Sequence, residues 1–190
     1  DVIWELNKDV TLIVGDFDYK APILDPNNFT GSASGITNLD AHKSMLENAA
    51  AHNRELLFDI HFLSERGSDP YNFMQVSLTL YDAFKKICPE AKAALCVLEL
   101  NANSHDFERA LCNALAIKFA EQHSDVIKIM CSANALQVQD QNDNGWNQGL
   151  LFMDNDSVWY QPAAYVDRMY LDAYLPKALN INSDDDTSTS

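Results

Sequence analysis

Short apolar segments alternate with helical segments along this chain, and that order restricts its fold more than any other feature. Apolar, strand-like segments occupy residues 11–15, 55–63, 93–101 and 126–131. Helical periodicity marks residues 39–53, 70–88, 106–123 and 162–175. Repeated β-α-β units build parallel strands joined by right-handed crossovers, and strands that are apolar almost throughout indicate that both sheet faces are covered. The sequence therefore predicts an α/β fold with a parallel sheet.

Polar residues lie at the ends of the predicted strands. Asp16, His61, Glu99 and Ser132 lie at or near the ends of the four strands, in chain order. Barrels and open parallel sheets both carry their chemistry at the C-terminal ends of strands. We therefore expect these four side chains along one edge of the sheet.

Glu99 is the strongest catalytic candidate among them. It follows four apolar residues, 95–98, so solvation alone does not account for it. An ionised carboxylate in this place can attack an anomeric carbon and form a glycosyl-enzyme ester. The structural alternative is a carboxylate that caps the next helix or binds loop amides. Asn101, Asn103 and His105 are its nearest polar neighbours in the sequence.

The orientation of Glu99 can be predicted from side-chain alternation. If Glu99 points into a common mouth, Leu95 and Val97 share its face, while Cys96 and Leu98 meet the helices.

His61 and the aspartates of the first strand are further candidates. By alternation, His61 shares a face with Asp59 and Leu57. His61 can donate a hydrogen bond to a substrate or to the nucleophile, or it can be a packed core histidine. Asp16 and Asp18 can bind sugar hydroxyl groups or supply an acid, or they can simply form a turn.

Aromatic residues gather after the last predicted strand. Trp146, Trp159, Tyr160 and Tyr165 could stack on sugar rings, because aromatic faces are apolar and their edges are polar. Packing is the favoured role for Trp159 and Tyr165, whereas Trp146 has the neighbours of a loop residue and stays open for either role. Residues 150–153 and 157–160 predict a small hairpin.

The helix over residues 106–123 has an apolar stripe at helical spacing. The stripe consists of Phe107, Leu111, Ala114, Leu115 and Phe119. Helical spacing places these five side chains on one face of the helix.

Charge and composition exclude several classes of partner. The formal net charge is −15, from 28 acidic and 13 basic residues, which argues against binding to nucleic acid or to an anionic membrane. No apolar run reaches the length of a membrane span. The four cysteines form no C-x-x-C pair, so the sequence does not suggest a zinc site. Their positions in or at the ends of predicted helices and strands favour buried free thiols over disulfides. We expect one domain over residues 1–179 and a disordered acidic tail over 180–190.

From about residue 54 to 176 the chain resembles the α-L-arabinofuranosidases of glycoside hydrolase family 51. The resemblance rests on motifs in matching order: Asp59-Ile-His-Phe62, Leu98-Glu-Leu-Asn101, the strand over 125–134, Gly145-Trp-Asn147 and Tyr160-Gln-Pro-Ala-Ala-Tyr-Val166. It implies the second half, strands five to eight, of a TIM (β/α)8 barrel. Glu99 would be the nucleophile, and His61, Asn101, Asn103 and Trp146 would contact the substrate.

The same resemblance implies a retaining hydrolase that removes terminal α-L-arabinofuranosyl units from arabinan or arabinoxylan. No metal or organic cofactor is implied. The acid/base of the family lies in an Asn-Glu pair of the N-terminal half-barrel, so that half is an implied partner.

Departures from the family pattern keep other functions open. Leu63 and Leu100 replace residues that are commonly aromatic, and Asn134-Ala135 replaces an Ala-Pro element. These changes favour a non-catalytic barrel half that binds carbohydrate or a protein partner through its aromatic loop. A third alternative is an endo-glucanase on the same scaffold.

Overall fold

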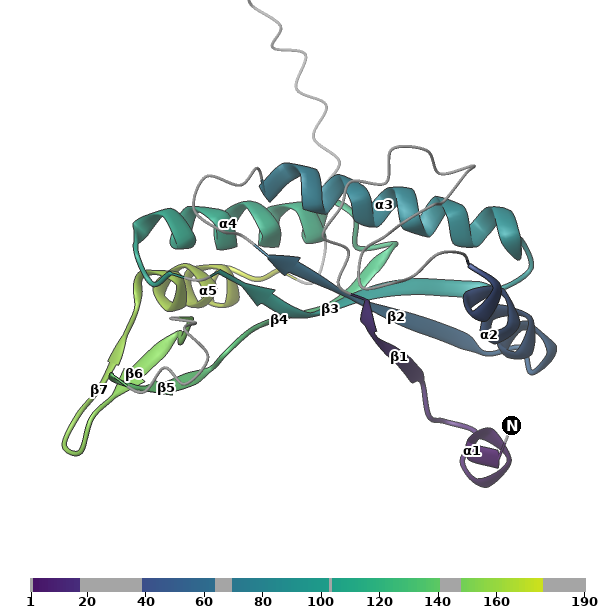
Figure 1. Ribbon diagram of the computed structural model, residues 1–190, viewed down its shortest axis with the longest axis horizontal. Helices are drawn as coiled ribbons and strands as arrows, with labels where there is room; N and C mark the ends of the chain where they lie inside the picture. Colours follow the sequence, from purple (N-terminus) through teal and green to yellow (C-terminus); the bar gives the residue numbers. More distant parts are fainter. Residues whose placement is uncertain (1, 18–38, 64–69, 103, 141–147, 176–190) are drawn as a thin grey trace, which may run out of the picture.

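The computed structural model describes residues 2–17, 39–63, 70–102, 104–140 and 148–175 (Figure 1). The described part contains five helices: α1 (Val2–Leu6), α2 (Asp40–Ala51), α3 (Pro70–Ile87), α4 (Phe107–Gln122) and α5 (Pro162–Asp172). Its seven strands are β1 (Leu12–Phe17), β2 (Glu55–Leu63), β3 (Lys92–Asn101), β4 (Ile127–Ser132), β5 (Leu136–Val138), β6 (Leu151–Met153) and β7 (Val158–Tyr160). The eight segments predicted from periodicity all occur, whereas α1 and β5 were not predicted. The predicted tail over 180–190 lies outside the described residues.

Strands β1 to β4 form one parallel sheet in the order β1-β2-β3-β4. Each crossover between neighbouring strands carries a helix where the structure describes it, with α3 between β2 and β3 and α4 between β3 and β4. The prediction of an α/β fold with a parallel sheet is confirmed. In the described part of the chain the sheet is open, with β1 and β4 at its edges, and no barrel is closed.

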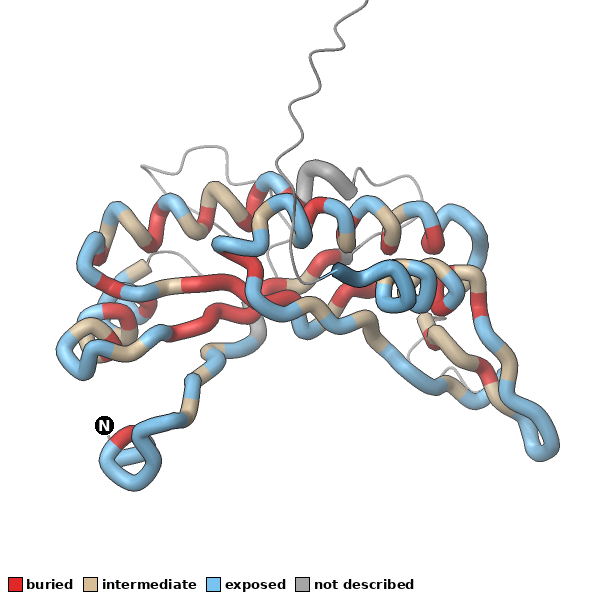
Figure 2. The backbone as a smooth tube through the Cα atoms, turned by 180° about the vertical axis from the view of Figure 1, so that it is seen from behind, coloured by how far each residue is buried: buried red, intermediate tan, exposed pale blue. Residues whose placement is uncertain are grey.

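The main core lies between one face of this sheet and the helices. Phe58 of β2 and Leu95 and Val97 of β3 pack with Phe84 of α3 and Phe119 of α4. Helices α3 and α4 lie on this same side of the sheet (Figure 1). Figure 2 shows the buried residues concentrated along the central strands. Removal of these apolar side chains from water is the main stabilising contribution to the fold.

The opposite face of the sheet holds a small second cluster of Leu57, Ala94 and Cys96. The cluster consists of sheet residues alone, so no described helix contributes to it. Leu95 and Val97 therefore face the helices, and Cys96 faces away from them. The predicted orientation of these side chains was wrong.

The physical reason is a bulge in β3. Asp59 and His61, two residues apart on β2, pair with Cys96 and Glu99, three residues apart on β3. One additional residue in a strand reverses the side-chain alternation beyond it. Glu99 therefore shares the open face with Cys96, and Leu98 is exposed instead of meeting the helices.

The apolar stripe of α4 is buried only in part: Phe119 belongs to the core, whereas most of the stripe does not. Phe107, Leu111 and Leu115 are exposed, by 69%, 51% and 36%. The buried residues of α4 are Arg109, Ala110, Asn113, Ala116 and Phe119. Alanines at a packed face let neighbouring elements approach closely, and the two buried polar residues are tolerated because each has hydrogen-bond partners.

A smaller sheet follows, in the order β5-β6-β7. Strands β6 and β7 are antiparallel, which confirms the predicted hairpin. Gly149 precedes β6 at a close contact, because a Cβ there would lie 2.6 Å from Cβ of Gln137 and 2.7 Å from Cε1 of Phe152. Helix α5 begins with Pro162 in its first turn, where a missing N–H costs nothing.

The cysteines all carry free thiols. Cys88 and Cys96 are buried, as predicted, but Cys112 is half-buried and Cys131 is exposed. Among the helices of the described ranges, none combines the length and apolar character that a bilayer crossing requires.

Candidate active site

The C-terminal ends of β2 and β3 place His61 directly opposite Glu99. The two residues are register partners in the parallel sheet, and neighbouring strands lie about 4.8 Å apart. Nδ1 of His61 is 3.5 Å from Oε2 of Glu99, an ion-pair distance when the imidazole is protonated. Two residues that the sequence predicted independently therefore belong to one site.

Asn101 orients the other oxygen of Glu99. Its Nδ2 donates a hydrogen bond of 2.8 Å to Oε1 of Glu99. The Asn101 side chain is buried, whereas the Glu99 side chain is 35% exposed. The carboxylate is therefore held in a defined orientation and can still be reached from solvent.

Asp59 completes the site, although the sequence reasoning gave it no catalytic role. Its Oδ2 lies 3.2 Å from Nε2 of His61, and its Oδ1 accepts a hydrogen bond of 2.8 Å from the backbone N–H of Leu98. The imidazole thus lies between two carboxylates, one buried and one accessible. The spacing of Asp59 and His61, two positions apart on a strand, was the signal that could have identified it.

Ser132, predicted at the same edge, belongs to a different network. Its Oγ donates to Oδ2 of Asp167 at 2.5 Å, and Nδ2 of Asn113 donates to Oδ1 of Asp167 at 3.0 Å. This network joins β4, α4 and α5. These hydrogen bonds tie the three elements together and do not involve Glu99.

Several predicted residues cannot be placed in the site. Asn103 and Trp146, predicted to contact the substrate, lie outside the described residues. The same holds for Asp18, and the structure describes only the backbone of Asp16 and Leu63.

The described aromatic residues after β4 divide between two environments. The ring of Trp159 meets that of Phe152 edge to face, with centroids 6.5 Å apart. Tyr160 and Tyr165 contact each other, at 5.3 Å, but are 46% and 56% exposed. Trp159 is packed against its neighbour, as expected. Tyr165 is too exposed to be a packing residue, which differs from the expectation.

A buried arginine ties the loops at this end of the sheet together. Arg109 of α4 donates hydrogen bonds to the backbone carbonyl oxygens of Ser104, Ala133 and Gln148. Burial lowers the pKa of its guanidinium to about 10, against the opposing effect of the nearby Asp167 carboxylate. The group therefore stays charged at neutral pH and holds the loops that follow β3 and β4.

The described part of the chain shows no metal site. Within those ranges, no group of three or more His, Cys, Asp or Glu side chains is arranged to hold a metal ion.

No protein-family model and no curated protein matches this chain. Among solved structures it is similar to the GH51 arabinofuranosidase from Xanthomonas axonopodis pv. citri, with a TM-score of 0.49 and 16% sequence identity. The similarity covers 70% of this chain and 32% of that enzyme, so the chain spans about a third of the enzyme's length. A likeness of this size assigns neither a family nor an activity. The function has to be argued from the side chains themselves.

Proposed function

We propose that this chain carries the nucleophile side of a retaining glycosidase active site, with Glu99 as the nucleophile. One observation carries the proposal. An accessible carboxylate stands at the C-terminal end of a central parallel strand, oriented by Asn101 and facing His61, which is itself backed by Asp59. Preorganised polar groups around a reactive carboxylate are what such catalysis needs.

The proposed chemistry is a double displacement. An oxygen of Glu99 forms a bond to the anomeric carbon as the bond from that carbon to the leaving oxygen breaks, and a carboxylic acid protonates the leaving oxygen. Water, deprotonated by the same second group, then cleaves the glycosyl ester and restores Glu99. In this scheme His61 and Asn101 are positioning residues for Glu99.

The second carboxyl group must stand about 5–5.5 Å from the nucleophile. Asp59 is unsuitable because its side chain is only 6% exposed and both of its oxygens are engaged, by His61 and by the N–H of Leu98. We therefore propose an acid/base from outside the described residues. The resemblance to family 51 implies a glutamate of an N-terminal half-barrel.

For the substrate we propose a terminal α-L-arabinofuranosyl unit of arabinan or arabinoxylan. The support is the order of the family-like motifs around Glu99 and His61 in the sequence. Asn103 and Trp146 are proposed to contact the sugar as well.

Replacement of Glu99 by Gln in the full-length protein tests the nucleophile. We expect kcat on an aryl α-L-arabinofuranoside to fall by about a thousandfold or more, because the amide cannot form the ester. Glu121→Gln, an exposed residue of α4, should leave the rate unchanged. A mechanism-based furanosyl inhibitor should label Glu99 in the wild type, as read by peptide mass spectrometry. Wild-type turnover by Glu99→Gln would refute the assignment.

A non-catalytic, carbohydrate-binding function is the second candidate. A cavity lined by aromatic and amide side chains, next to the small sheet, favours it. Sugar binding without any labelling of Glu99 would support this candidate over the hydrolase.

A further inference from the structure

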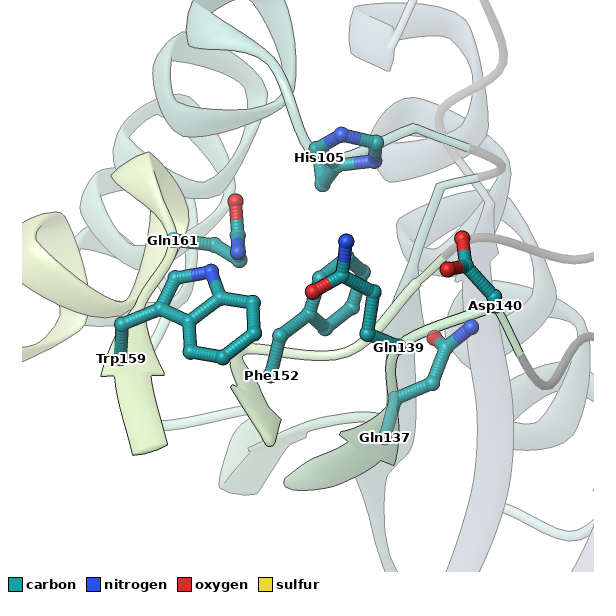
Figure 3. Close-up of a pocket in the computed structure, with 7 residues that line it drawn as sticks. All are labelled: His105, Gln137, Gln139, Asp140, Phe152, Trp159 and Gln161. Atoms are coloured by element: carbon teal, nitrogen blue, oxygen red, sulfur yellow. The ribbon is translucent and has the colours of Figure 1, made fainter. Parts of the chain in front are cut away.

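A cavity of about 390 Å³ lies between the small sheet and the loop that follows β3 (Figure 3). Gln137 of β5, Phe152 of β6 and Trp159 of β7 line it, His105 closes it from the β3 loop, and Gln161 borders it just before α5. The volume falls in the range of sites for small ligands. None of its lining side chains belongs to the Asp59–His61–Glu99 group.

The apolar wall of the cavity is preformed. Phe152 contacts Trp159 edge to face at 6.5 Å and His105 at 5.2 Å. Phe152 is held from behind by Gly149, whose position has no room for a Cβ. Trp159 is half-buried, so part of its indole remains available to a ligand. A fixed, partly open aromatic wall of this kind suits stacking against a ring.

Gln161 supplies the second, independent indication of a ligand. The residue is only 7% exposed, and its side chain has no hydrogen-bond partner among the described residues. Figure 3 shows its amide directed into the cavity, as is that of Gln139. An amide that faces the cavity can both donate and accept hydrogen bonds, so it can bind a molecule that carries hydrogen-bonding groups.

The polar groups of the cavity also define the chemistry of that molecule. Amides both donate and accept hydrogen bonds, which suits hydroxyl groups. The only carboxylate among the described lining residues is Asp140, and apart from His105 none of them can be cationic. This arrangement disfavours phosphates and carboxylates. We propose that the cavity binds a neutral saccharide, with one ring on Trp159 and its hydroxyl groups on Gln139 and Gln161.

Calorimetric titration of the full-length protein with xylotriose and cellotriose, neutral trisaccharides without an arabinofuranosyl unit, tests this site. We expect at least one to bind, and Trp159→Ala and Gln161→Leu to weaken its binding by about tenfold or more. Gln139→Leu should weaken it as well. Because Gln139 is exposed, that variant is informative even where the buried substitutions affect folding.

Two control variants separate this site from the proposed catalytic centre. Gln75→Leu changes an exposed glutamine of α3 and should leave binding intact, whereas Glu99→Gln reports any sugar that binds at the proposed catalytic centre instead. If Glu99→Gln lost binding while Trp159→Ala kept it, the sugar would bind at Glu99 and not in the cavity. That result would overturn the cavity proposal and leave the proposed hydrolase standing. Absence of trisaccharide binding at millimolar concentration, or tighter binding of adenosine than of any trisaccharide, would also overturn it.

Discussion

His42 shows how one buried side chain links the stability of this protein to pH. It lies on α2 with 2% exposure, and its ring stacks on Phe58 at 5.8 Å and on Phe84 at 5.3 Å. Burial lowers the pKa of the imidazole from 6.5 to about 4. The folded protein therefore holds His42 in its neutral form across a range in which the unfolded chain takes up a proton.

The resulting contribution to stability is complete above pH 6.5 and is lost as the pH falls towards 4. The loss amounts to at most about 3 kcal/mol in the free energy of unfolding. We expect His42→Phe to flatten this part of the pH dependence, measured by urea unfolding at several pH values between these limits. His52→Gln, at an exposed histidine of the same segment, should keep it. Equal slopes in wild type and His42→Phe would contradict the pKa shift.

Glu99 illustrates a second property of single residues in this fold. Its two oxygens meet different partners, Asn101 on its own strand and His61 on the next. The first partner follows from the local sequence, whereas the second depends on how β2 and β3 pair. The surroundings of this carboxylate are therefore built jointly by one strand and its neighbour.

At the scale of elements, α4 organises the end of the sheet that carries the site. Asp106 caps the helix, since its Oδ1 accepts a hydrogen bond of 3.1 Å from the N–H of Arg109. The Arg109 side chain then binds the backbone carbonyls of Ser104, Ala133 and Gln148, which follow β3, follow β4 and precede β6. One turn of helix thus holds the loops after β3 and β4 in place.

Replacement of Arg109 by Met should lower the free energy of unfolding by about 3 kcal/mol, because three carbonyl oxygens lose their donor. Arg168→Met is the matched control: that side chain is 63% exposed and, among the described residues, pairs only with Asp172, at 3.4 Å. We expect a change within about 0.5 kcal/mol for the control. Chemical unfolding of both variants measures the difference, and similar values would show that Arg109 has no special structural role.

The apolar stripe of α4 also has to be explained at this scale. Phe107, Leu111 and Leu115 point away from the core because the buried face of α4 consists of two alanines, Phe119 and two hydrogen-bonded polar side chains. Helical periodicity alone could not choose between the two faces, since both carry apolar residues.

At the scale of the whole molecule, the two faces of the main sheet differ. The helices pack on one face, and the Glu99 group lies on the other, together with the partly exposed Ile13, Leu98 and Ile129. We expected both faces of the sheet to be covered. Within the described part of the chain, helices cover one face and leave the other open. The open face is where the proposed N-terminal half-barrel would have to pack.

Net charge acts on the molecule as a whole. With a formal charge of −15, repulsion between acidic groups favours the unfolded chain at low ionic strength. Screening by physiological salt should raise Tm by a few degrees relative to a low-salt buffer. The variant Glu121→Lys makes the net charge less negative at an exposed position. Its Tm should therefore rise less with added salt than the Tm of the wild type. Calorimetry with two different chloride salts separates screening from specific ion binding, and a Tm independent of salt would contradict the argument.

The order, type and approximate bounds of the main helices and strands were available from the sequence, because hydrophobic periodicity is a local property. The position of Glu99 and His61 at strand ends followed from the same rule. The hairpin of β6 and β7 was also evident from its two short apolar segments.

Only the tertiary structure decided which way the side chains face. The bulge in β3 arises from pairing with β2, and it brings Glu99 to the open face, beside His61 and Asp59. The choice of a buried face on α4 and the meeting of His105 with Trp159 and Gln161 around one cavity likewise depend on contacts between distant segments. Such contacts are set by the packing of the whole chain, and no local pattern encodes them.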